Sequence, residues 1–400
     1  MPRVSPFTGL LFDESVVGPL DQVTAPPYDA ISTESERRLH EASPHNVVRL
    51  ILGRDEPGDD DRDNKYTRAS GLLREWRSAG VLRETEHPSW FLYEMRFVFQ
   101  GRPGRVRGVI GAVDIEPLGG GVMPHERTLP GPMQDRMRVL RTVRANLSPV
   151  YALWNGPTPG LADVLDEAAA TREPQASVAD EEGVEHRMWV LPSGGEGEPA
   201  PWDRIAGDLA GERLLIADGH HRYSVALAFR EQMREEAGPG PWDRMPMLLV
   251  DAAVEDPPVL PIHRVVLDGT AVRTAGRLVR DLSEVLAALD DDKLVYGSAA
   301  REGPRLVHRV DSLEGTPPTV CALHERILGD AGLRFVTDAA AAEEAVRRGA
   351  SRAAFFLPPT RVRRIRDVIE GGGTLPQKST YFWPKPRTGM VIRALDRPEP

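Results

Sequence analysis

The chain has 400 residues, a formal net charge of -10 and an isoelectric point near 5.6, which is enough length for two or three domains. The negative charge argues against general binding to nucleic acid, because that affinity comes mainly from lysine and arginine displacing counterions. No apolar run approaches the roughly 20 residues that span a bilayer, and the single cysteine, Cys321, excludes an intramolecular disulfide. We therefore expect a cytoplasmic protein that binds neither nucleic acid nor membrane.

The first part of the chain alternates loops, helices and strands. It begins with a proline-rich loop, TAPPYDAIS at 24–32, and continues with a helix whose apolar end, NVVRLILG at 46–53, is strand-like. A helix is predicted for 66–79. The β-branched and aromatic runs SWFLYEMRFVF at 89–99 and RVRGVIGAVDI at 105–115 predict two strands.

An amphipathic helix is predicted after residue 132, where apolar residues recur at helical spacing. These residues are Met133, Met137, Leu140, Val143 and Leu147. Arg138, Arg141 and Arg144 lie three apart on another side of this helix, and we interpret them as a solvated face. Further on, RLLIAD at 213–218 suits a buried strand.

The segment DGHHR, residues 218–222, follows that strand and precedes a second helix, whose face is defined by Val225, Phe229 and Met233. The first N–H groups of a helix have no partner inside it and lie at the positive end of its dipole, so they attract phosphates.

Each residue of this turn can then contribute to a phosphate site. Gly219 allows close approach of an anion to the backbone, and Arg222, with His220 and His221, donates to phosphate oxygens. Asp218 is placed to hold Mg²⁺ or to cap the helix. The alternative is an ordinary capping turn with two exposed imidazoles. A zinc site is disfavoured, because adjacent histidines point in different directions and neither HExxH nor CxxC occurs.

A second candidate segment is MPHERTLPGP at 123–132, which follows the strand at 105–115. Glu126 lies in a loop that no apolar pattern explains, and a carboxylate there can act as a general base toward a substrate hydroxyl. Its neighbours His125 and Arg127 are candidate substrate-binding residues. The alternative is a glutamate placed before a helix, where the dipole stabilises it.

A third candidate segment is LPQKSTYFWPKP at 375–386. Lys378, Ser379 and Thr380 supply one cation and two hydroxyls for a phosphate, although the GxxxxGK spacing of a P-loop is absent. In the N-terminal part, Tyr28, Asp29 and Arg49 are further candidates for substrate binding, since polar residues in proline-fixed loops are often functional. Structural turns explain Tyr28 and Asp29 equally well.

Over nearly its full length, the chain resembles a bacterial family known as a domain of unknown function, DUF1015. The resemblance lies in the PPYD, PHERT, ADGHHRY and QKSTYF segments. The order of PHE, DGHHR and a C-terminal Lys-Ser-Thr is also similar to the short free serine kinases of the ParB/sulfiredoxin-like superfamily. Those enzymes transfer a phosphoryl group from a nucleotide, with Mg²⁺, to L-serine, giving O-phosphoserine.

The resemblance implies roles for matching residues only. Glu126 takes the place of the glutamate that activates the serine hydroxyl. The DGHHR loop, from Asp218 through Gly219, His220 and His221 to Arg222, is expected to hold the nucleotide phosphates and to bear on the reacting centre. This chain is longer than the small kinases and has a large insertion between Glu126 and Asp218. Its acceptor pocket can therefore differ from theirs. ATP is the default donor, with ADP and CTP as alternatives.

The expected fold class is α+β, with a ParB/sulfiredoxin-like catalytic core at 105–268. An N-terminal α/β region, 1–104, packs on the core, and a C-terminal α/β region, 269–400, ends in a loop that returns to the site. The expected partners are a nucleotide and a small hydroxyl-bearing substrate, and no pattern indicates an oligomeric state. The alternatives are a ParB-like nucleotide-binding regulator without turnover and a nucleotide phosphohydrolase. A sulfiredoxin-like reductase is improbable, because DGHHR contains no thiol.

Overall fold

The computed structural model describes residues 2–126, 130–154, 161–194, 199–267, 272 and 274–396, with only the backbone of 130–132. The chain divides into two compact units. The first unit combines residues 1–124, 128–256 and 384–400, and the second combines 125–127 and 257–383. The chain therefore contributes to the second unit twice, at 125–127 and at 257–383, and its last residues belong to the first unit.

The first unit is built on a nine-stranded mixed sheet. Its strands are β1 Val4–Ser5, β4 Ser89–Phe99, β5 Arg102–Asp114, β6 Val122–Met123, β8 Val150–Trp154, β9 Ala176–Ala179, β10 Glu185–Pro192, β11 Leu214–Asp218 and β12 Arg244–Asp251. They follow the order β6-β11-β8-β12-β5-β4-β10-β9, and β1 pairs with β5. β8 is parallel to β12 and antiparallel to β11. β11, the strand that ends at Asp218, lies between β6 and β8, one strand from the end of this order.

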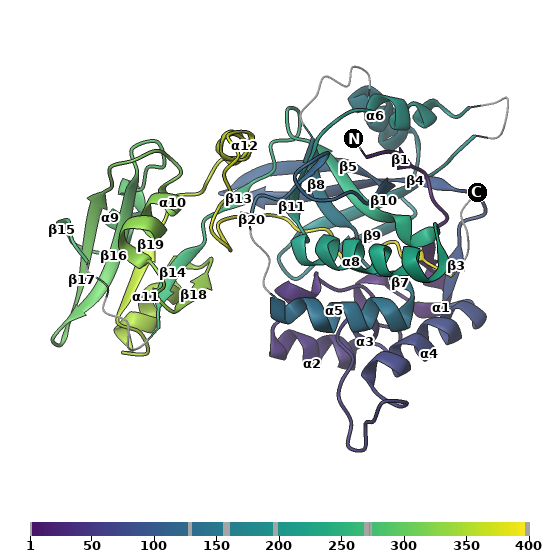
Figure 1. Ribbon diagram of the computed structural model, residues 1–400, viewed down its shortest axis with the longest axis horizontal. Coiled ribbons are helices and arrows are strands. Elements are labelled where there is room, and N and C mark those ends of the chain that lie inside the picture. Colours follow the sequence, from purple (N-terminus) through teal and green to yellow (C-terminus); the bar gives the residue numbers. More distant parts are fainter. Residues whose placement is uncertain are drawn as a thin grey trace. The chain divides into compact units, whose positions relative to one another are not determined.

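Helices and two small strand pairs complete the first unit. The helices are α1 Glu14–Val17, α2 Thr33–Ala42, α3 Val48–Ile51, α4 Lys65–Ser78, α5 Pro130–Val143, α6 Leu161–Thr171, α7 Ile205–Asp208 and α8 His220–Ala237. The pairs are β2 Leu10–Phe12 with β3 Leu82–Glu84, and β7 Ala145–Asn146 with β21 Arg393–Ala394. Figure 1 shows α5 and α8 side by side, and α3 and α4 contact α5 in turn.

The second unit contains a six-stranded antiparallel sheet. Its elements are β13 Val259–Leu260, β14 His263–Val266, β15 Arg277–Val279, α9 Leu282–Ala288, β16 Val295–Glu302, β17 Arg305–Ser312, α10 Thr319–Leu323, β18 Leu333–Val336, α11 Ala339–Arg347, β19 Ala353–Phe356, α12 Val362–Glu370 and β20 Tyr381–Phe382. The sheet order is β15-β17-β16-β19-β14-β18, and β13 pairs separately with β20. One apolar cluster joins the sheet to α10 and another joins it to α9 and α11.

Most of the predicted local elements are confirmed, and the mixed α+β class is the observed one. The strand predicted at 89–99 is β4, and the helix that begins after DGHHR is α8. The strand character predicted for 46–53 is wrong, because this segment forms the short helix α3. The side chain of Asn46 accepts a hydrogen bond from the Val48 N–H at 2.9 Å and so starts a helical turn.

The observed units divide the chain differently from the predicted domains. The predicted boundary at residue 105 falls inside β5, so the N-terminal hundred residues and the following segment share one sheet. The second unit begins at Pro257, before the predicted boundary at 269, and residues 384–400 belong to the first unit. The β4–β5 hairpin is the physical reason, because its antiparallel pairing runs across residue 105.

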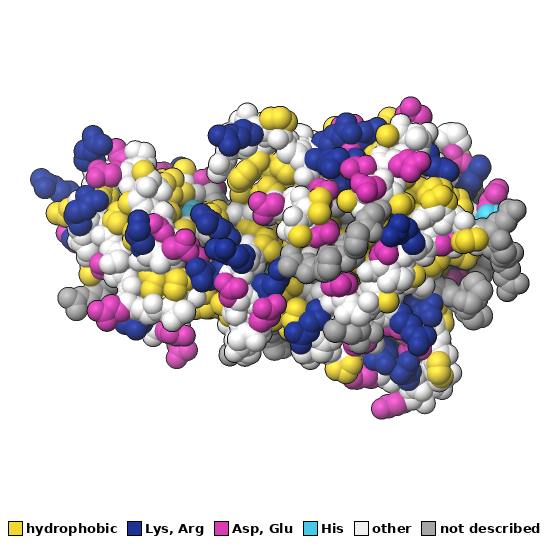
Figure 2. Space-filling view, turned by 90° about the horizontal axis from the view of Figure 1, so that it is seen from above, with side chains coloured by type: hydrophobic (Ala, Val, Ile, Leu, Met, Phe, Trp, Pro, Cys, Tyr) yellow, Lys and Arg dark blue, Asp and Glu magenta, His cyan; other side chains and the backbone are white. Residues whose placement is uncertain are grey.

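The surface carries charges of both signs. Figure 2 shows acidic and basic side chains interspersed over the face that it presents. In the part of the chain that the structure describes, no helix combines the length and apolar character needed to cross a bilayer.

Candidate functional site

The turn between β11 and α8 brings the DGHHR segment to the start of an 18-residue helix. β11 ends at Asp218, and α8 begins at His220. Gly219 joins them with φ 94° and ψ 26°, a left-handed conformation that favours glycine. The predicted strand-to-helix turn is therefore confirmed, and the positive end of a long helix lies at Asp218.

Asp218 is the centre of a buried ion-pair cluster in the first unit. It is 7% exposed. Its Oδ2 accepts a hydrogen bond from Arg222 Nη2 at 2.6 Å, and its Oδ1 accepts one from Lys385 Nζ. Burial alone raises the pKa of Asp218, but the Lys385 and Arg222 cations outweigh it and hold the pKa well below its usual range. Two cations therefore share one carboxylate.

Arg222 is fixed in place by contacts on several sides. Its Nη1 donates to Ser148 Oγ at 3.0 Å and to the Pro149 carbonyl oxygen. A Cβ at Gly219 would lie 3.0 Å from the Arg222 guanidinium, so the glycine also makes room for that side chain. Tyr223 anchors α8 because its hydroxyl bonds both the N–H and the carbonyl of Glu116, at 2.9 and 2.8 Å. These contacts hold the Arg222 side chain in one position beside Gly219.

The two histidines of the turn differ in exposure. His220 is buried, with 6% of its surface exposed, and it adds to the positive charge that lowers the pKa of Asp218. His221 is half-buried on the next position of α8. The two imidazoles of the turn therefore have different surroundings.

The role of Asp218 as a magnesium ligand stays a prediction. Both of its oxygens already accept hydrogen bonds from cationic side chains. Among the described residues, no group of three or more His, Cys, Asp or Glu side chains is placed to hold a metal ion. The cluster fits an anion such as phosphate better than a cation.

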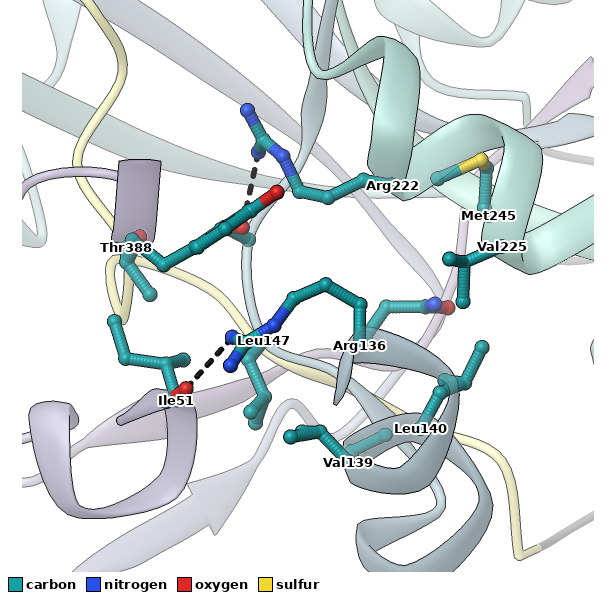
Figure 3. A pocket seen from close by; sticks show the side chains of 13 residues that line it. Ile51, Arg136, Val139, Leu140, Leu147, Arg222, Val225, Met245 and Thr388 are labelled. Atoms are coloured by element: carbon teal, nitrogen blue, oxygen red, sulfur yellow. Dashed lines mark hydrogen bonds between the residues drawn. The ribbon is translucent and has the colours of Figure 1, made fainter. Parts of the chain in front are cut away.

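A cavity adjoins this cluster, also within the first unit. It has a volume of about 70 Å³, and its walls include Tyr28, Arg136, Ser148 and Arg222. In Figure 3, Arg136 from α5 and Arg222 from α8 extend toward one end of the cavity, and Val139, Leu140, Val225 and Met245 lie toward the other end. The structure therefore brings Tyr28 of the proline-rich loop to Arg222 of the DGHHR turn.

Tyr28 lies beside two arginines. The guanidinium carbon of Arg136 is 4.4 Å from the centre of the Tyr28 ring, a cation–π contact. Burial, with a contribution from Asp29, raises the pKa of Tyr28 to about 12. The hydroxyl therefore stays neutral near pH 7 and can donate a hydrogen bond.

The other N-terminal candidates have different surroundings. Asp29 is exposed. Arg49 donates to the carbonyl oxygens of His40 and Ser43, at 2.7 and 3.3 Å, where α2 ends. These bonds satisfy carbonyls that a helix end leaves without partners, so a structural role explains Arg49.

In the second unit, the PHE segment lies against the C-terminal QKST segment. Glu126 pairs with Leu375 in a parallel β-bridge, and the Leu375 N–H donates to the His125 carbonyl at 2.9 Å. His125 Nε2 and Thr380 Oγ1 are 2.6 Å apart. Two of the three candidate segments, about 250 residues apart in the chain, are therefore neighbours.

The remaining QKST residues are held close to this contact. Ser379 Oγ donates to the Pro376 carbonyl. Lys378 has φ 54°, a left-handed conformation that is uncommon outside glycine. Arg127, the remaining substrate-binding candidate, lies outside the described residues.

A buried arginine accompanies Glu126. Arg264 is 0% exposed, its Nε donates to His324 Nε2 at 3.0 Å, and its Nη1 donates to the Ile262 carbonyl at 2.6 Å. Burial lowers the pKa of Arg264 to about 10, and the charge of Glu126 acts in the opposite direction. Arg264 therefore stays charged near pH 7 and interacts electrostatically with Glu126.

His324 is neutral in this arrangement. Its Nε2 accepts from Arg264, and burial, together with the Arg264 charge, lowers the pKa of His324 to about 4. It begins a π-helical turn, His324–Leu328, a form that is frequent at functional sites.

The thiol of Cys321 has no nucleophilic character in this structure. Burial raises its pKa to about 11, and Glu325 contributes to the rise. A thiol with such a pKa is protonated near pH 7, which argues against the reductase alternative.

The sequence matches a described protein family. Residues 4–327 match the family described as a protein of unknown function (DUF1015). The chain belongs to this family. No curated protein matches the sequence significantly.

Solved structures show only distant likeness to this DUF1015 protein. A free serine kinase in complex with AMP is 13% identical, with a TM-score of 0.36, and the match covers 69% of this chain and 89% of that one. A conserved hypothetical protein from Pyrococcus furiosus is 12% identical, with a TM-score of 0.33, over 67% and 90% of the two chains. SbnI from Staphylococcus aureus, truncated at its C-terminus, is 9% identical, with a TM-score of 0.35, over 72% and 84%. Scores this low indicate partial overlap, so these structures define neither the fold of the DUF1015 protein nor its activity.

Three residues near the candidate segments, two in the first unit and one in the second, were not predicted from the sequence. Lys385, the second partner of Asp218, lies between two prolines in WPKP, and that placement was the available signal. Arg136 lies on the predicted amphipathic helix, but it is not part of the row of arginines three apart at 138, 141 and 144. Arg264 is a charged residue within an apolar strand, HRVV, and such a residue calls for a partner.

Proposed function

We propose that this DUF1015 protein is a nucleotide-dependent phosphotransferase that phosphorylates the hydroxyl of a small molecule, with free L-serine as the first acceptor. The observation that carries the proposal is the buried cluster of Asp218, Arg222 and Lys385 at the start of α8. Such a cluster offers two fixed cations next to the N–H groups of a helix start, which is a suitable environment for phosphate.

The first unit is assigned the donor phosphates. The N–H groups after Gly219, the side chains of His220 and His221, and the charges of Arg222 and Lys385 are the donors in this assignment. The nucleotide is expected as its Mg²⁺ complex, with ATP as the default and ADP or CTP as alternatives, because Mg²⁺ commonly binds through substrate phosphates. The proposal includes a ParB/sulfiredoxin-like core that carries the start of α8.

The second unit is assigned the general base. Glu126 takes the proton of the acceptor hydroxyl while the hydroxyl oxygen attacks the terminal phosphorus. The bond from that phosphorus to the bridging oxygen breaks, and the nucleotide leaves with one phosphate fewer. Lys378 supplies a positive charge and Thr380 a hydroxyl for the transferred group, and Ser379, whose Oγ donates to the Pro376 carbonyl, orders this segment. Phosphoryl transfer depends mainly on alignment and charge stabilisation, so this set of side chains is sufficient.

Phosphorus NMR tests the proposal directly. Purified protein is incubated with Mg²⁺, L-serine and, separately, ATP, ADP and CTP. We expect the signal of O-phosphoserine to grow as the donor loses one phosphate. Release of inorganic phosphate without phosphoserine would favour the phosphohydrolase alternative, and a bound but unchanged nucleotide would favour the regulator.

A further inference from the structure

We propose that the cavity between α5 and α8 is the acceptor pocket of this protein, and that Arg136 there binds a free carboxylate of the acceptor. The acceptor class is then small hydroxy acids, including hydroxy amino acids, rather than simple alcohols or polyols. This assignment rests on the proposed phosphotransfer, because only a transferase needs an acceptor. All walls of the cavity belong to the first unit.

Arg136 is fixed in the wall of this cavity. Its side chain is 10% exposed. Its Nε and Nη2 donate to Asp135, and its Nη1 donates to the Ile51 carbonyl at 2.6 Å. Asp135 also accepts a hydrogen bond from the Tyr66 hydroxyl at 2.8 Å. A guanidinium carries five N–H groups, so one N–H on each Nη atom of Arg136 has no acceptor among the described residues.

The donors at Arg136 suit a carboxylate. Asp135 already pairs with Arg136, so a ligand is recognised by directed N–H groups rather than by an excess of charge. The neutral hydroxyl of Tyr28, which lies against the same guanidinium, is a further donor. A carboxylate only accepts hydrogen bonds and matches a guanidinium with paired bonds. An alcohol or an amide would bring donors of its own to a wall that already supplies donors.

Arg222 relates the cavity to the donor phosphates. It lines the same cavity and keeps its assignment to the phosphates, so the carboxylate does not depend on it. Figure 3 shows Arg136 and Arg222 extending toward the same end of the cavity. An acceptor whose carboxylate lies at Arg136 therefore carries its hydroxyl toward the phosphates, as an in-line attack on phosphorus requires.

The rest of the wall limits what else the acceptor carries. Four apolar side chains lie at the other end, those of Val139, Leu140, Val225 and Met245. A further hydroxyl there would lose its hydration without a new partner, which disfavours polyols and sugars. Asn146 and Ser148 also line the cavity, and their oxygens can accept hydrogen bonds from the ammonium group of a hydroxy amino acid.

The size of the cavity fits a small acceptor. One water molecule needs roughly 10–15 Å³ of such space, so a cavity of about 70 Å³ holds roughly five to seven groups of that size. L-Serine and 3-hydroxypropionate, with seven and six non-hydrogen atoms, are of this size. A nucleoside is far too large.

Saturation-transfer NMR on the full chain, without nucleotide and again with ADP and Mg²⁺, tests the assignment. The probes are L-serine and 3-hydroxypropionate, which carry a carboxylate, and L-serinamide and serinol, which have an uncharged group in its place. We expect saturable binding of at least one carboxylate probe, and binding of the other two that is about tenfold or more weaker. Equal binding of L-serinamide or serinol, or no binding of either carboxylate under both conditions, would overturn the inference.

Two variants locate the bound carboxylate. Arg136→Met should weaken its binding about tenfold or more, and Arg136→Lys, which keeps a cation, should recover part of that loss. Val139→Phe narrows the cavity from the half-buried face of α5 and should weaken binding without removing a charge. Arg141→Met is the matched control, since Arg141 is exposed on the same helix. Wild-type affinity in folded Arg136→Met or Val139→Phe protein would refute the assignment.

Kinetics separate this inference from the proposed function. In Arg136→Met, the Michaelis constant for L-serine should rise about tenfold or more, while the dissociation constant of the nucleotide stays unchanged. Phosphoserine formed with an unchanged Michaelis constant would overturn the inference and leave the phosphotransfer standing. Selective carboxylate binding without any phosphorylated product would overturn the phosphotransfer and leave carboxylate recognition by Arg136 standing.

Discussion

The free energy of unfolding of the Asp218→Asn variant is expected to be about 3–5 kcal/mol lower than that of the wild type, because removal of one partner of a buried ion pair is strongly destabilising. Arg222 and Lys385 each donate to one carboxylate oxygen, and the amide of asparagine would present an NH₂ group to one of them. Urea unfolding followed by tryptophan fluorescence measures the effect. Six of the seven tryptophans lie in the first unit, so the signal reports chiefly on that unit.

Two further variants control this measurement. Glu34→Gln removes an exposed ion pair with Arg37 and should change the free energy of unfolding by less than about 1 kcal/mol. The double variant Asp218→Asn with Lys385→Met also removes one of the two cations that contact Asp218. It should recover part of the lost free energy of unfolding. A loss in Asp218→Asn no larger than in Glu34→Gln would show that the cluster contributes little to stability.

The Glu126→Gln variant is expected to lower turnover by about two to four orders of magnitude while nucleotide binding stays the same. The amide cannot take the proton of the acceptor hydroxyl, but it keeps the shape of the side chain. Steady-state formation of the phosphorylated product gives turnover, and calorimetric titration gives the dissociation constant of the nucleotide.

Glu370→Gln is the control for this variant. Glu370 is an exposed carboxylate at the end of α12, a few residues before the QKST segment, and its removal should leave both quantities unchanged. Wild-type turnover in Glu126→Gln would remove Glu126 from the role of base. Loss of nucleotide binding together with turnover would assign it to binding instead.

Local structure was predictable where the pattern of side chains is strong. The run RLLIAD reads as a buried strand, and the spacing of Val225, Phe229 and Met233 reads as a helix face, so the turn between them was expected. The helix α3 was mispredicted because its buried apolar residues resemble a strand, and the position of Asn46, whose side chain donates to the carbonyl oxygens of Gln22 and Thr24, depends on a distant part of the chain.

Long-range partners were not predictable from these patterns. Lys385 contacts Asp218 across 167 residues of chain, and Arg264 interacts with Glu126 from a different strand of the second unit. Periodicity reports which face of an element is buried, but it does not report which distant element covers that face. The return of residues 384–400 to the first unit after the second unit is complete has no local signature either.

The resemblance to small kinases supplied roles for single residues, and the structure supplies their neighbours. Tyr28 was predicted to bind substrate and Arg222 to bind phosphate, and both residues line one cavity. His125 and Thr380 were also separate expectations, and they are 2.6 Å apart. Arg49 was grouped with the substrate-binding candidates, yet its bonds at the end of α2 explain it without a substrate.

Nucleotide titration of the first unit's cation cluster tests the central claim most directly. The dissociation constants of ATP, ADP and CTP are measured by calorimetry for the wild type, Arg222→Ala and Lys385→Met, with Arg141→Met as the exposed control. The account predicts that at least one nucleotide binds the wild type and the control equally, and that each cluster variant binds it about tenfold or more weakly. Equal binding by all four proteins, or no binding by the wild type, would contradict the assignment of the donor phosphates to the start of α8.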